Sequence, residues 1–88
     1  NGQRNTIIVR GISTLAKIGC EQAIKTIGHY LLAFKSIYVR RNAAEYLGET
    51  GHESALIYLE AGLNDSSPGV RQSALRSTAQ IHAVQHSW

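Results

Sequence analysis

Cysteine is nearly absent from the sequence, with Cys20 as its single example. One thiol cannot form a disulfide within the chain, and it cannot supply a four-cysteine zinc site. A lone cysteine fits a reducing compartment, so we expect a cytoplasmic protein. Because no histidine lies near Cys20 in the sequence, we interpret it as a small buried residue at a turn between helices.

Proline and long apolar runs are also scarce. Pro68 is the only proline, and apolar residues recur every three or four positions, a combination that favours helices throughout. No stretch approaches the roughly 18 consecutive apolar residues of a membrane-spanning helix. The segment NGQRNTIIVR lacks the apolar core of a secretory signal. We therefore expect an all-α protein that does not enter a membrane.

Charged side chains are few as well, at 17% of the chain against roughly 25% in a typical soluble domain. Hydrophobic residues make up 43%, which is a globular composition. The 88 residues have room for one domain, residues 1–88, with a modest core. The net charge of +3 is small for a dedicated nucleic-acid binder.

Two pairs of segments repeat each other along the chain. VRRNAAEYLGETG begins at Val39, and VRQSALRSTAQIH begins 31 residues later at Val70. Upstream, GCEQAIKTI from Gly19 matches GHESALIYL from Gly51, 32 residues later. A fixed period of this length indicates stacked helical units. The units cover about residues 5–35, 36–66 and 67–88.

Each unit also carries signals for where its helices begin and end. Ser36 and Ser67 are expected N-caps, and Pro68 stands at a first helical position, where its missing N–H is no loss. The unit glycines can end a helix in the left-handed conformation. We expect helices over about residues 6–18, 21–34, 37–49, 53–63 and 68–84.

The repeated pattern resembles the HEAT-like repeat of the phycobilisome-lyase type. In that pattern Asp-x-x-Pro-x-Val-Arg is followed by Ala-x-x-x-Leu-Gly-x-x-Gly-x-x-x-Ala-Leu. The second unit carries it at Val39, Arg40, Ala43, Ala44, Leu47, Gly48, Gly51, Ala55 and Leu56. The third unit carries it at Asp65, Pro68, Val70, Arg71 and Ala74. The first unit keeps only Gly19, Ala23 and Ile24 and lacks the Val-Arg pair.

This resemblance implies a short right-handed α-solenoid of HEAT-like helical hairpins, with about two and a half repeats and five helices. It says little about function, because the family includes bilin-lyase subunits as well as scaffolds in signalling and degradation. We expect the core to contain Ile7, Leu15, Ile24, Ile27, Leu31, Val39, Ala43, Leu47, Leu56, Leu59, Leu63, Val70, Ala74 and Ile81.

No pattern in the sequence points to catalysis. His82 and His86 are four residues apart and could share a helix face, but no carboxylate or cysteine accompanies them as a further metal ligand. A Ser-His-Asp order, a Gly-rich phosphate loop and paired carboxylates are all missing. We therefore expect no enzyme activity, no cofactor and no metal. Arg40 and Arg71 recur at one place in successive units, and we expect them to bind loop carbonyls or the side chains of Asp65 and Asn64.

The solvent face of each unit's second helix is the expected binding surface. Projection at 100° per residue places one set of residues opposite the core, on the concave side of the solenoid. This partner-binding set is Gln22, Lys25, His29, Ser54 and Tyr58. Its mixed aromatic and polar composition favours a protein–protein interaction scaffold or adaptor. The alternatives are a nucleic-acid-binding module, for which no aromatic platform is evident, and a helper subunit of a bilin lyase, which the resemblance alone implies.

The last helix is the expected site of self-association. Its unit contains no second helix to cover it, and solenoids usually need a polar capping element at each end. We expect a homodimer, or stacking on further repeats, through an exposed apolar stripe. That stripe consists of Leu75, Ile81, Val84 and Trp88.

Overall fold

The computed structural model describes residues 2–85, and these residues form helices joined by short turns, with no strand among them. The bounds agree with the expected helices to within a few residues, and the fourth begins as a 3₁₀ turn, Glu53–Ala55. The all-α architecture of stacked helical hairpins is thus confirmed. The helices are α1 (Gly2–Ile18), α2 (Glu21–Ala33), α3 (Ile37–Thr50), α4 (Leu56–Gly62) and α5 (Pro68–Gln85).

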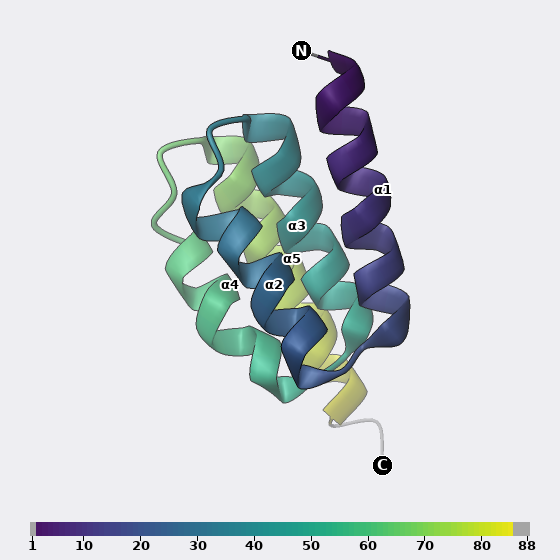
Figure 1. Cartoon of the computed structure of the whole chain (residues 1–88). Coiled ribbons are helices and arrows are strands. Elements are labelled where there is room, and N and C mark those ends of the chain that lie inside the picture. Colours follow the sequence, from purple (N-terminus) through teal and green to yellow (C-terminus); the bar gives the residue numbers. More distant parts are fainter. Residues whose placement is uncertain (1, 86–88) are drawn as a thin grey trace.

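The helices lie in two layers (Figure 1). The first helices of the units, α1, α3 and α5, form one layer, in which α3 packs against both of the others. The second helices, α2 and α4, form the other layer and pack against the first. Within residues 2–85, α3 therefore lies between α1 and α5 in its layer.

Residues that were expected to begin or end helices are found in capping positions in the structure. The Ser36 hydroxyl accepts a hydrogen bond from the Val39 amide at 3.3 Å, as an N-cap does. Gly19 and Gly51 have φ values of 66° and 67°, the left-handed conformation in which a glycine avoids steric strain. Cys20 differs from expectation: it is exposed, and its side chain makes no capping hydrogen bond to α2.

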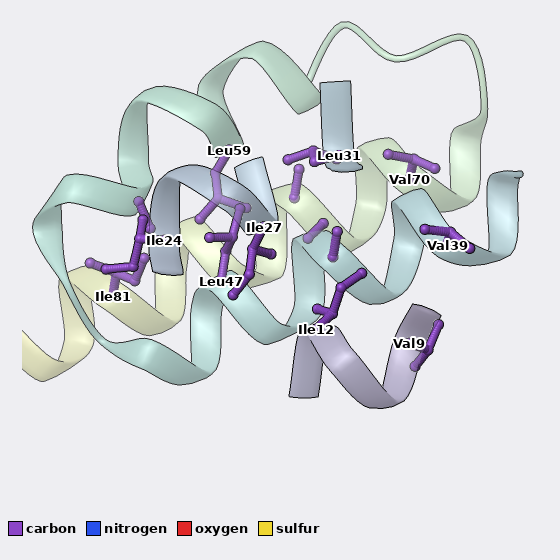
Figure 2. Packing of buried hydrophobic residues seen from close by; sticks show 14 residues of the cluster. Val9, Ile12, Ile24, Ile27, Leu31, Val39, Leu47, Leu59, Val70 and Ile81 are labelled. Carbon is purple, nitrogen blue, oxygen red and sulfur yellow. The ribbon is translucent and has the colours of Figure 1, made fainter. Parts of the chain in front are cut away.

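Most of the expected core is confirmed. Figure 2 shows buried side chains from every helix, among them Ile12, Ile27, Leu47, Leu59 and Ile81. Three expected core residues lie at the margin, partly buried against the central cluster: Leu15, Leu56 and Leu63. The expected residues that are buried are Ile24, Ile27, Leu31, Val39, Ala43, Leu47, Leu59, Val70, Ala74 and Ile81.

Ile7 was wrongly assigned to the core. It is 67% exposed, and Val9 and Ile12 are the buried residues of α1. At the repeat spacing of 31 residues, Val39 corresponds to Ile8, which is partly buried against the core, and Ala43 corresponds to Ile12, which is fully buried. The expectation for Ile7 assumed a spacing of 32 residues in the first unit, whereas the buried face of α1 follows the spacing of 31 residues that relates Val39 to Val70.

The contact between α3 and α5 is unusually close. The buried Ser77 hydroxyl of α5 donates a hydrogen bond of 2.7 Å to the Ala44 carbonyl oxygen of α3. Gly48 faces the same serine, and a Cβ added there would overlap the Ser77 side chain and lie 2.8 Å from its Cα. The small residues of α3 thus set how near the two helices approach.

Candidate functional site

A hollow of about 380 Å³ runs along α2. Three of the predicted partner-binding residues, Gln22, Lys25 and His29, line it, because spacings of three and four residues place side chains on one face of a helix. Its other lining residues are Thr26, Tyr30, Ala33 and Phe34. The structure therefore brings together the α2 part of the predicted surface. We call this feature the α2 hollow.

An aromatic pair forms the apolar part of the α2 hollow. The rings of Tyr30 and Phe34 lie 5.5 Å apart between centroids, at an interplanar angle of 54°. Both side chains are partly buried against the core, so the hollow has a firm apolar wall. Sequence reasoning did not select them. The signal that could have found them is the spacing of four residues between two aromatic side chains at the end of a helix.

The polar part of the α2 hollow is basic. Lys25 and His29 are exposed beside the aromatic pair, and none of the lining residues is acidic. The Thr26 hydroxyl donates to the Gln22 backbone carbonyl oxygen of its own helix at 3.0 Å, and Gln22 is itself exposed. An apolar wall with a basic edge can take up an apolar side chain that is flanked by a hydrogen-bond acceptor or a carboxylate.

The two other predicted residues do not line the α2 hollow. Ser54 is exposed in the 3₁₀ turn before α4. Tyr58 is partly buried, and its ring packs on Gly28 of α2 so closely that a Cβ at that glycine would overlap ring atoms. Tyr58 therefore contributes to packing between the second helices. A role of Ser54 or Tyr58 in partner binding stays a prediction.

Arg40 fixes the backbone at one end of the α2 hollow. Its guanidinium donates to the carbonyl oxygens of Phe34 and Lys35 at 2.9 and 2.8 Å. It also forms a bidentate pair with Asp65, from Nε and Nη2, at 2.9 and 3.0 Å. Arg40 thus joins the turn before α3 to the turn before α5. The expectation that Arg40 and Arg71 bind loop carbonyls and Asp65 is confirmed, since Arg71 donates to the Asp65 carbonyl oxygen.

The Asp65 carboxyl has a lowered pKa. Burial by itself would raise the pKa, but hydrogen bonds from Arg40 and the Ser67 amide, and the positive charges of Arg40 and Arg71, outweigh burial. A carboxyl whose pKa is lower in the folded state stabilises the protein above its unfolded pKa. That contribution is lost as the pH falls through the folded value.

We therefore expect the wild-type protein to lose stability relative to the Asp65→Asn variant below about pH 4, near the pKa of an unfolded aspartate. Urea unfolding of both proteins at a series of pH values measures this difference. It should be largest near neutral pH, where the wild type is the more stable, and should shrink on acidification. A difference that is independent of pH would contradict the role of the charged carboxylate.

The described part of the chain contains neither a metal-binding cluster nor a membrane-spanning helix. Within residues 2–85, no group of three or more histidine, cysteine, aspartate or glutamate side chains could hold a metal ion. No helix in this range is both long enough and apolar enough to cross a membrane.

Comparison with known proteins identifies one family. Residues 7–79 match the family described as HEAT repeats. The matched range begins within α1 and ends within α5, so it includes the α2 hollow and both arginines of the loop contacts. A search of curated proteins finds no match to the chain.

Proposed function

The chain belongs to the family of HEAT repeats, and from this premise we propose that it is a protein-interaction module that binds a segment of another protein in the α2 hollow. The observation that carries this proposal is the joining of a basic edge, Lys25 and His29, to the apolar wall of Tyr30 and Phe34. Interfaces are typically built in this way, with an aromatic centre and a polar rim.

The expected partner segment follows from this composition. An apolar side chain would pack against the aromatic pair, and an acidic residue beside it would approach Lys25 and His29. A hollow of about 380 Å³ has room for one or two side chains rather than a whole helix. The fit therefore favours a short linear segment over a large flat surface.

We expect the double variant Lys25→Ser, His29→Ser to bind such segments about tenfold more weakly, because it removes the positive charge from the hollow. Peptides selected from a displayed library on the wild-type protein provide the ligands, and isothermal titration calorimetry measures the affinities. The melting temperature should be unchanged, since both side chains are exposed. Tyr58 is left intact in this variant because its ring packs on Gly28.

Lys17→Ser is the matched control, because it removes a positive charge from an exposed position on α1 outside the α2 hollow. It should leave the affinity within about twofold of the wild type. Equal losses of affinity in the control and the double variant would show that only net charge matters. The hollow would then not be the binding site.

We also propose that the chain acts without catalysis, that it works in the cytoplasm, and that its repeats are of the phycobilisome-lyase type. The absence of a catalytic motif in the sequence supports a role without catalysis, and the single cysteine supports a cytoplasmic location. The Val-Arg and Gly positions of the second and third units support the repeat type. A role as a helper of a bilin lyase rests on this resemblance alone, and no observation favours nucleic acid as the partner.

The predicted homodimer depended on an apolar stripe along α5 that the structure changes. Ile81 was expected to be partly exposed but is fully buried in the core, because it lies on the same face of α5 as Val70 and Ala74. Leu75 and Val84 are 60% and 51% exposed, yet nine residues place them half a turn apart, on opposite sides of the helix. Trp88 lies outside the described residues. Self-association stays a prediction, which sedimentation equilibrium can measure.

A further inference from the structure

Arg40 and Arg71 make the same loop contact in successive units. Arg40 Nη1 donates to the carbonyl oxygen of Phe34, six residues earlier, at 2.9 Å. Arg71 Nη1 donates to the carbonyl oxygen of Asp65, also six residues earlier, at 2.6 Å. The two guanidinium groups are therefore held at equivalent places, one at the turn before α3 and the other at the turn before α5.

The two arginines differ in their second partner. Nε and Nη2 of Arg40 bind the two carboxylate oxygens of Asp65, and this pair is nearly buried, with side chains 12% and 11% exposed. Arg71 is exposed and its charge acts on the Asp65 carboxyl, but within residues 2–85 its Nε and Nη2 make no hydrogen bond to a carboxylate or other acceptor. A guanidinium that one loop bond already positions, with its second edge open, is suited to bind a carboxylate in the bidentate manner.

The helix beside Arg71 has an uncovered flank. Four residues on one side of α5 are exposed, namely Gln72, Leu75, Arg76 and Ala79. In the 31-residue register they correspond to the flank of α3 against which α5 packs, where Ser77 contacts Ala44 and Gly48. We call this set the outer flank of α5. Since the corresponding surface of α3 receives a helix, the outer flank of α5 has the position to receive one as well.

The charge of this surface indicates which helix it would receive. α5 carries Arg71 and Arg76 and no acidic residue between Pro68 and Gln85. Two copies of the chain facing each other through this flank would bring like charges together, which opposes a symmetric pair. An acidic helix would be attracted to the same surface.

We propose that Arg71 and the outer flank of α5 form a docking site for an acidic helical segment of another protein. A carboxylate of that segment binds Arg71 as Asp65 binds Arg40, and its helix lies against Leu75 and Ala79. This site is separate from the α2 hollow, so the inference goes beyond the function proposed above.

A pair of synthetic peptides tests the site. The first copies residues 64–85, the segment that α3 receives within this fold, with Arg71→Gln, Arg76→Glu and Gln80→Glu to make it acidic. The second is identical but also contains Asp65→Asn. Fluorescence anisotropy of the labelled peptides at low salt measures their affinity for the full chain. We expect the aspartate peptide to bind about fivefold more tightly than the asparagine peptide.

Variants of the protein then locate the contact. Arg71→Gln should weaken binding of the aspartate peptide and bring the two peptides to equal affinity. Arg76→Gln, which removes a charge from the same flank, should weaken both peptides and preserve their ratio. The double variant of Lys25 and His29 should change neither affinity by more than about twofold, which separates this site from the α2 hollow.

Four outcomes would overturn the proposal. The first is equal affinity of the two peptides for the wild-type protein, which can be read even if a variant fails to fold. The second is a ratio that survives Arg71→Gln. The third is no binding of the aspartate peptide up to about 1 mM. The fourth is self-association of the chain that Arg71→Gln abolishes, because a second copy would then occupy the flank.

Discussion

The Gly48→Ala variant should lose about 3 kcal/mol of unfolding free energy, which lowers the melting temperature by roughly 10–25 °C in a domain of this size. The added methyl group would overlap the Ser77 side chain and approach its Cα, so a change of side-chain rotamer cannot relieve the clash. α3 and α5 would have to move apart, which also stretches the hydrogen bond from Ser77 to the Ala44 carbonyl oxygen. Thermal unfolding followed by circular dichroism measures the loss.

Gly11→Ala is the matched control for this prediction. Gly11 also lies inside a helix, but it is exposed, and an added Cβ would have no atom within 4 Å. Alanine there should raise the unfolding free energy by about 0.5–1 kcal/mol, because it restricts the unfolded chain and favours helix. If both variants were stabilised alike, the close approach of α3 and α5 would not be a feature of the folded protein.

The Arg40→Ala variant should lose about 3 kcal/mol of unfolding free energy. It would leave the nearly buried Asp65 carboxylate without its bidentate partner and the Phe34 and Lys35 carbonyl oxygens without their donor. Burying an unpaired charge is more costly than losing a surface ion pair, so the loss should exceed that of an exposed arginine. Urea unfolding at neutral pH gives the free energies.

Arg71→Ala provides the comparison, because Arg71 has the same place in the next unit but within residues 2–85 makes a hydrogen bond to the Asp65 carbonyl oxygen and none to a carboxylate. It should lose no more than about 1 kcal/mol. Similar losses for the two variants would mean that the carboxylate pair adds nothing to the loop bonds. The interpretation of Arg40 as a link between successive turns would then be wrong.

The helices and their pairing into units could be predicted because their signals are local. The Ser36 cap, the left-handed Gly19 and Gly51, and the position of Pro68 each act within a few residues of the chain. The 31-residue register likewise placed Arg40 and Arg71 at equivalent turns without reference to the fold.

The α2 hollow could be predicted in part. Gln22, Lys25 and His29 were found because one helix face depends only on spacing along the chain. The aromatic wall was missed because Tyr30 and Phe34 are partly buried residues that also belong to the core margin. A projection that separates core from solvent leaves such intermediate positions unassigned.

The sequence by itself determined the all-α class, the repeat register and the buried faces of the central helices, because apolar spacing and caps act within one helix. Only the tertiary structure decided which of these faces are covered. Ile7 and Ile8 are adjacent and chemically identical, and only the packing of α1 on α3 shows that Ile8 lies against the core while Ile7 is exposed. Arg40 and Arg71 share a place in the repeat, but only the fold shows that the turn before α5 brings the Asp65 carboxylate to Arg40, because the two residues lie 25 positions apart in the sequence.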